Sequence, residues 1–96
     1  MEAQWEFQDR FATAFDEVGV LQEMGREGWE MTSFGPFVLH FRRALDPGQR
    51  VPWEYLRVTE LGTPVKHQQL QQEGWTYSGS WMKTFHYYKR AKPLGA

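Results

Sequence analysis

The sequence predicts an α+β fold made of two tandem βαββ repeats. Three short segments recur in the same order, 46 to 48 residues further along the chain. They read Trp-Glu-Phe at 5–7 and Trp-Glu-Tyr at 53–55, Glu-Gly-Trp at 27–29 and at 73–75, and Arg-Arg-Ala at 42–44 and Lys-Arg-Ala at 89–91. In both copies a helical pattern ends at the glycine of the middle segment, and the alternation typical of strands follows it.

The repeats span about residues 4–46 and 51–92 of a single domain, 1–96. A chain of this length has room for one hydrophobic core, and neither copy is large enough to bury an apolar face by itself. We therefore expect the two copies to share a core and to be related by a pseudo-twofold axis.

The expected elements of the first repeat are a strand over 5–11, a helix over 16–27, and strands over 29–34 and 37–43. Val20 and Met24 have helical spacing, and Asp16 stands at the position of an N-cap. Gly28 stands where the end of a helix requires a left-handed backbone, which glycine adopts without steric cost. The remaining residues alternate as in half-buried strands.

The expected elements of the second repeat are a strand over 53–59, a helix over 64–73, and strands over 75–81 and 84–90. Thr63 is the expected N-cap, and Pro64 takes the first helical position, where its missing N–H costs nothing. Together the elements predict a six-stranded, mostly antiparallel sheet packed with two helices, a variant of the ferredoxin-like split βαβ arrangement. The strand order stays open.

Two stretches of the chain resemble a bacterial family called domain of unknown function 2812 (DUF2812). They are LQEMGREGWEMTSFGPFVLHFRR at 21–43 and LQQEGWTYSGSWMKTFHYYKR at 70–90. The recurring WE…EGW pattern is also similar to a single-copy family, domain of unknown function 4177 (DUF4177). The resemblance covers about residues 4–91 and implies the fold, but it implies no catalytic residue. Members of the first family are often encoded beside PadR-like transcription regulators, which implies a link to transcription regulation.

Composition excludes several classes of function. The chain has no cysteine, so disulfides, thiolate zinc sites and cysteine nucleophiles are excluded. No apolar run is long enough to span a membrane. The polar start, MEAQWEFQD, is unlike a signal peptide, so we expect a cytoplasmic protein. Hydrophobic residues make up 41% and charged residues 24%, as in ordinary globular domains.

The histidines and carboxylates offer a weak case for chemistry. His86 lies among aromatic residues, and with Glu54 it is the candidate for contact with a ligand. No spacing typical of a metal site is present, so we expect no metal, no cofactor and no catalysis. Glu6 and Glu54 follow matching tryptophans and could form the carboxylate pair of a glycoside hydrolase, although pairing with arginine is the simpler expectation. A small-molecule-binding domain, or an enzyme that uses His86, is the first alternative function.

Charge is distributed unevenly along the chain. Residues 1–46 carry nine acidic and four basic residues, a net charge of -5, whereas residues 47–96 carry three acidic and seven basic residues, a net charge of +4. Basic and aromatic residues alternate in the second hairpin, a composition that suits single-stranded nucleic acid. This is the second alternative. The overall charge of -1 gives no general basic field, so we do not expect a nucleic-acid partner.

Aromatic residues make up 17% of the chain, more than two helices can cover on both faces of a sheet. We therefore expect an exposed aromatic surface that binds a second copy, as a homodimer, or another protein. The expected anchors are the aromatic residues of the hairpins, namely Trp81, Phe85, Tyr87, Tyr88, Phe34 and Phe41. The sequence thus predicts a small, non-catalytic interaction module.

Overall fold

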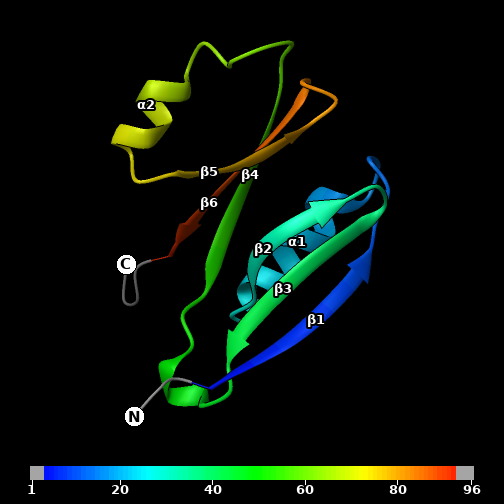
Figure 1. Ribbon diagram of the computed structural model, residues 1–96. Helices are drawn as coiled ribbons and strands as arrows, with labels where there is room; N and C mark the ends of the chain where they lie inside the picture. Colours follow the sequence, from blue (N-terminus) through cyan, green and yellow to red (C-terminus); the bar gives the residue numbers. More distant parts are fainter. Residues whose placement is uncertain (1–3, 93–96) are drawn as a thin grey trace.

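A computed structural model describes residues 4–92 and contains two βαββ units (Figure 1). The first unit consists of β1 (Trp5–Phe11), α1 (Glu17–Arg26), β2 (Glu30–Gly35) and β3 (Val38–Ala44). A short 3-10 helix, η1 (Pro47–Gln49), joins it to the second unit, which consists of β4 (Trp53–Thr59), α2 (His67–Gln72), β5 (Thr76–Trp81) and β6 (Phe85–Ala91). The predicted α+β class and the tandem repeat are confirmed.

The strands form two antiparallel sheets of three strands, in the orders β1-β3-β2 and β4-β6-β5. Their registers match: Trp5 pairs with Ala44 in the first sheet, as Trp53 pairs with Ala91 in the second. β2 and β5 also carry a bulge at the same point of the repeat. The prediction of one six-stranded sheet is wrong. Within residues 4–92 no ladder joins the two sheets, so each copy completes its own sheet.

The recurring Glu-Gly-Trp segment ends both helices in the same way. Gly28 and Gly74 have φ values of 87° and 93°, which confirms the predicted left-handed position. The N–H of Trp29 donates to the carbonyl oxygen of Met24 at 3.0 Å, and that of Trp75 donates to Leu70 at 3.0 Å. These bonds satisfy carbonyl groups that the helix end would leave free.

The start of α2 differs from the prediction. The helix begins at His67, three residues later than expected, because the backbone over Val65 and Lys66 is a turn. The N–H of His67 donates to the carbonyl of Pro64, and the N–H of Val65 donates to the carboxylate of Glu60. In the first repeat Asp16 is the N-cap, but its side chain accepts hydrogen bonds from Thr13.

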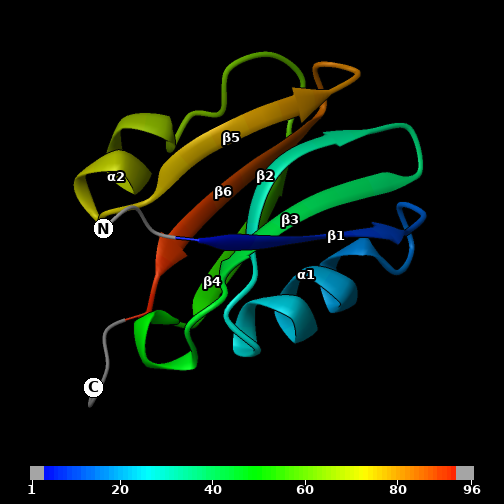
Figure 2. The same cartoon turned by 60° about the horizontal axis from the view of Figure 1, so that its bottom comes forward.

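The two repeats do not use the same surfaces against each other. α1 lies along β4 of the second repeat, whereas α2 stands on the far side of the second sheet (Figure 2). Among the described residues, β1 has no comparable contact with α2. The contact between the repeats is therefore one-way, and the expected pseudo-twofold arrangement is not formed within the described residues.

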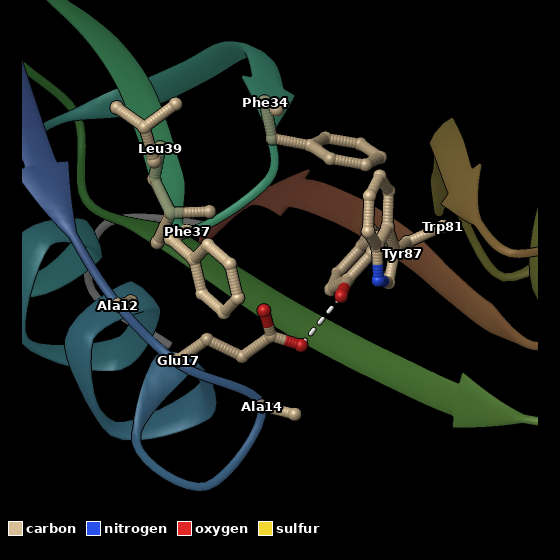
Figure 3. Close-up of a pocket in the computed structure, with 10 residues that line it drawn as sticks. Ala12, Ala14, Glu17, Phe34, Phe37, Leu39, Trp81 and Tyr87 are labelled. Atoms are coloured by element: carbon tan, nitrogen blue, oxygen red, sulfur yellow. Dashed lines mark hydrogen bonds between the residues drawn. The ribbon is translucent and has the colours of Figure 1, made fainter.

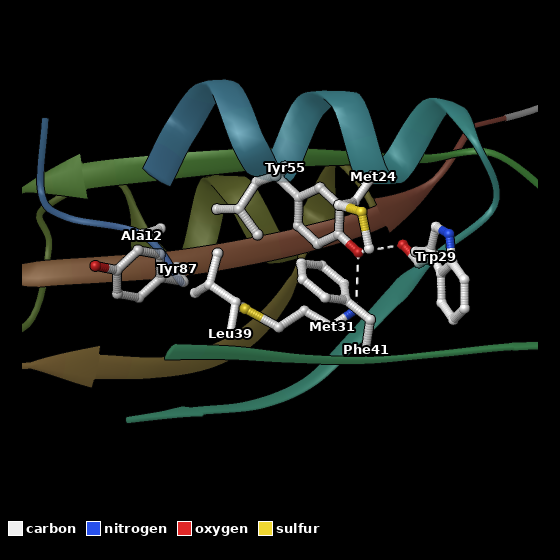
Figure 4. Packing of buried hydrophobic residues seen from close by; sticks show 9 residues of the cluster. Ala12, Met24, Trp29, Met31, Leu39, Phe41, Tyr55 and Tyr87 are labelled. Carbon is white, nitrogen blue, oxygen red and sulfur yellow. Dashed lines mark hydrogen bonds between the residues drawn. The ribbon is translucent and has the colours of Figure 1, made fainter. Parts of the chain in front are cut away.

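The core lies between α1, the first sheet and the near face of the second sheet (Figure 4). Tyr55 of β4 reaches into it, where its hydroxyl donates to the carbonyl oxygen of Trp29 at 2.6 Å and accepts from the N–H of Met31 at 2.8 Å. The buried residues come from both repeats: Ala12, Leu21, Met24, Trp29, Met31, Leu39, Phe41, Tyr55 and Tyr87. The first repeat thus buries its apolar face with side chains of the second.

Candidate functional site

Each sheet has a front face, which carries the helix of its own repeat, and a back face. In both sheets the residues of the edge strand that share the back face begin with the repeated tryptophan. The back face of the second sheet is covered by the first repeat, through Tyr55, Arg57 and Lys89. The back face of the first sheet is largely exposed at Phe7 and Phe11, and its end at Trp5 and Arg42 borders Val51 and Trp53 in a small pocket. We call it the Phe7 face, and its residues are Trp5, Phe7, Asp9, Phe11, Val38, His40 and Arg42.

The Phe7 face is aromatic and exposed. Phe7 is 74% exposed and Phe11 is 83% exposed. Trp5 lies beneath the guanidinium group of Arg42, at 4.3 Å from the ring centroid. A polar pair divides the face, because His40 Nδ1 lies 2.7 Å from a carboxylate oxygen of Asp9. An exposed aromatic face with polar groups interspersed is typical of a protein interface.

The Phe7 face is not among the surfaces predicted from the sequence. Its signal was present in the alternation of β1, which places Trp5, Phe7 and Phe11 on one side of the strand. The same alternation in β4 leads to the core. Sequence alone could not separate the two strands, because the fold buries one and exposes the other.

Several predicted anchors lie in the interior. Phe41, Tyr87 and Tyr88 are buried, so a partner cannot reach them, and we no longer place them on a binding surface. Phe34 and Phe85 are partly buried and pack against the core. These side chains hold the two sheets together instead of meeting a partner. Of the six expected anchors, only Trp81 has a large exposed surface.

Trp81, Phe34 and Tyr87 do come together, at a shallow pocket between the two hairpins (Figure 3). The hydroxyl of Tyr87 donates to the carboxylate of Glu17 on its floor. The cavity measures about 70 Å³.

Glu54, the predicted ligand contact, belongs to an arginine clamp that both repeats contain. Arg90 donates to Glu54 at 2.7 Å and to the carbonyl of Glu73 at 2.8 Å, and it lies over the ring of Trp75. In the first repeat Arg43 makes the same contacts with Glu6, Glu27 and Trp29. Glu6 and Glu54 are thus held in separate ion pairs, as the simpler expectation had it, and they do not form a carboxylate pair.

His86, the other predicted ligand contact, is buried on the front face of the second sheet. Its Nε2 lies 2.9 Å from the carbonyl oxygen of Glu60, and its Nδ1 lies 3.1 Å from the hydroxyl of Tyr77. Nε2 therefore carries the proton, because a carbonyl can only accept. His67 lies nearby, with its Nδ1 at 2.8 Å from the hydroxyl of Tyr88.

A cavity of about 190 Å³ opens beside these histidines, between α2 and the second sheet. Its lining consists of Thr63, Pro64, His67, Tyr77 and His86. We call this region, together with Trp75 and Leu70, the α2 groove. Within residues 4–92 no three metal-ligating side chains gather in one place, and no helix there is long and apolar enough to cross a membrane.

Comparison of the chain with protein-family models, with curated proteins and with solved structures gave no match. The resemblance to DUF2812 and DUF4177 stays a prediction. What the protein does must therefore be argued from the two uncovered regions, the Phe7 face and the α2 groove.

Proposed function

We propose that this protein is a non-catalytic interaction module of the cytoplasm that binds a protein partner through the Phe7 face. One observation carries the proposal: Phe7 and Phe11 project from a single edge strand and are both largely exposed. Burying a phenylalanine side chain is worth about 1.5–3 kcal/mol, so leaving two of them in water is unfavourable unless a partner covers them.

The composition of the face suits a partner of protein. Aromatic side chains and arginine dominate the energy of protein interfaces, because they bury a large area with few rotatable bonds. The Phe7 face offers both, since Arg42 is stacked on Trp5. Asp9 and His40 lie between the aromatic side chains, and their hydrogen bonds can fix the orientation of a bound partner.

Site-specific photocrosslinking in cells tests the proposal. A benzophenone side chain is placed at Phe7 and, as a matched control, at Gln22, which is exposed on α1. We expect a discrete protein adduct from position 7 and a weaker adduct, or none, from position 22. An adduct of twice the mass of the chain identifies a second copy, and any other mass identifies a different protein. Equal labelling at the two positions would contradict the proposal.

The cavity of about 190 Å³ favours a second candidate function, the binding of a small molecule in the α2 groove. Two imidazoles and a phenol there supply hydrogen bonds and aromatic faces. Native mass spectrometry of the gently purified protein tests this candidate. A retained mass of a few hundred daltons that is lost in the Tyr77→Ala variant would support it, and bare protein would count against it.

A further inference from the structure

We propose that the partner of the Phe7 face is a second copy of this chain, and that the face packs into the α2 groove of that copy. The inference rests on the proposed function and adds both the partner and its docking surface. It follows from a contact that the chain already makes with itself: the back face of the second sheet covers the front face of the first repeat.

The contact between the two repeats of one chain shows how a back face packs on a front face. Tyr55 inserts between α1 and β2 through its two hydrogen bonds with the backbone. Beside it, Arg57 donates to the carboxylate of Glu17 at 2.7 Å. At the far end Lys89 donates to Glu30 at 3.0 Å. Aromatic insertion at the centre and ion pairs at the rim thus join a back face to a front face.

The Phe7 face has the same design, position by position. Phe7 pairs with Arg42 in the first sheet, as Tyr55 pairs with Lys89 in the second. The stacks match too: Arg42 lies over the Trp5 ring at 4.3 Å, and Lys89 lies over the Trp53 ring at 5.7 Å. Tyr55 is 7% exposed and Phe7 is 74% exposed. The Phe7 face is therefore equivalent to the surface of the second sheet that packs on the first repeat, but its Phe7 and Phe11 side chains remain exposed.

The α2 groove corresponds to the surface of the first repeat on which the second sheet packs, but no second sheet covers it. Met31 is 1% exposed beneath the second sheet, whereas Tyr77, at the same position of the second repeat, is 37% exposed. Trp29 is buried, and Trp75 is only half-buried. The cavity of about 190 Å³ lies where the second repeat lacks a covering strand. An aromatic side chain of a second copy would fill this space.

Charge permits the same pairing. The lining of the α2 groove contains no lysine, arginine, aspartate or glutamate, so it presents no like charge to Asp9 or Arg42 of the Phe7 face. In detail, Asp9 stands where Arg57 stands, and Thr63 stands where Glu17 stands. In the proposed dimer Asp9 and Thr63 therefore face each other where Arg57 and Glu17 meet within the chain, and no two like charges come together.

The chain cannot make this second contact with itself. α2 and β1, the strand that carries Phe7, lie on opposite sides of the second sheet (Figures 1 and 2). Each copy therefore offers one face and one groove, and two copies that exchange them cover both surfaces. Gln71 stands where the first helix has Gly25, so the docked β1 lies further from α2 than β4 lies from α1. The larger cavity beside α2 suits this wider spacing.

A charge exchange tests the pairing, with dimer dissociation measured by native mass spectrometry and analytical ultracentrifugation. Thr63→Glu places a carboxylate opposite Asp9 and should weaken the dimer at least tenfold, or about 1.4 kcal/mol, because like charges placed together at an interface repel. Asp9→Arg combined with Thr63→Glu rebuilds the internal pair Arg57–Glu17 and should restore affinity. Gln22→Glu, on the exposed side of α1, is the control and should change nothing. Both altered residues are exposed, so the fold is retained.

The outcomes separate the inference from the proposed function. Association that falls with Thr63→Glu and returns in the double variant supports the inference. A dimer that Phe7→Glu abolishes and Thr63→Glu leaves intact would overturn it, because the Phe7 faces would then meet each other. A wild-type chain that stays monomeric at all concentrations also overturns it. In that case an adduct of a different protein at position 7 would still support the proposed function.

Discussion

Gly25 of α1 and Trp53 of β4 touch through their backbones. A β-carbon added to Gly25 would overlap the carbonyl oxygen of Trp53, so no other residue fits at this point without a shift of the helix. The sequence alone presents Gly25 as a weakness in the helix, since glycine costs about 1 kcal/mol relative to alanine. The structure shows that this glycine is what allows the helix of one repeat to lie against the strand of the other.

Gly25→Ala should therefore destabilise the protein. The added methyl group must displace β4, and overpacking of this kind costs about 1–3 kcal/mol. That loss exceeds the gain of about 1 kcal/mol in helix propensity. Urea unfolding followed by circular dichroism measures the change. Gly19→Ala, in the same helix but with no neighbouring atom within 4 Å, is the control and should raise stability by up to about 1 kcal/mol. A neutral effect at Gly25 would show that α1 and β4 are further apart than described.

Tyr55→Phe should cost about 1–3 kcal/mol in the free energy of unfolding. The loss of the hydroxyl leaves the carbonyl of Trp29 and the N–H of Met31 without a partner in the core. Chemical denaturation of the purified variant gives the value. Tyr77→Phe removes a hydroxyl from a partly exposed side chain, where water can replace it, and should cost less. Equal losses in the two variants would argue that Tyr55 is not buried between the repeats.

Stability should decline in alkaline solution above pH 10. Burial raises the pKa values of Tyr55, Tyr87 and Tyr88 above the ordinary 10.0, and hydrogen bonding to Glu17 raises that of Tyr87 further. Below pH 10 the phenols are protonated in both states, so their contribution is complete. Above it the unfolded chain loses protons that the folded chain retains, and the free energy of unfolding falls by up to about 1.4 kcal/mol per pH unit for each phenol.

Urea unfolding at pH 8 and at pH 11 measures this slope. The Tyr55→Phe variant should show a smaller decline than the wild type, because it has one fewer phenol to titrate. A stability that stays constant to pH 11 would indicate that these tyrosines ionise in the folded protein as readily as in water.

The two arginine clamps should differ in strength. Arg43→Lys keeps the charge but loses the fork that joins Glu6 to the carbonyl of Glu27, and should cost about 1–3 kcal/mol. Arg90→Lys makes the equivalent change beside Trp75, which is only half-buried, and should cost less. Thermal unfolding of both variants decides the order. A loss of stability that is larger for Arg90→Lys than for Arg43→Lys would mean that Trp75 is more deeply buried in solution than in the structure of the single chain.

Most of the local structure could be predicted from the sequence. All six strands are found within a residue or two of the predicted bounds, because alternation and turn residues act locally. Gly28 and Gly74 ended their helices as expected, since the left-handed backbone is a property of glycine itself. The start of α2 was predicted three residues too early. The N–H of Val65 donates to the carboxylate of Glu60, which precedes the helix, and the backbone there is not helical.

The sequence predicted that an exposed aromatic surface exists, but it did not predict which residues form that surface. An excess of aromatic residues indicated an exposed face, but the chosen anchors Phe41, Tyr87 and Tyr88 are core residues. Phe7 and Tyr55 hold the same place in the repeat and have the same alternation, yet one is exposed and the other buried. No local pattern distinguishes them, because exposure depends on which surface the other repeat covers.

The sequence by itself determined the repeat, the glycine ends of its helices and the approximate bounds of its strands, since these follow from the conformational preferences of a few neighbouring residues. Only the tertiary structure decided that the repeats stack one way. That choice depends on close backbone approach between distant segments, which Gly25 permits between α1 and β4. The one-way stacking buries Tyr55, and it leaves Phe7, at the same place in the first repeat, in water.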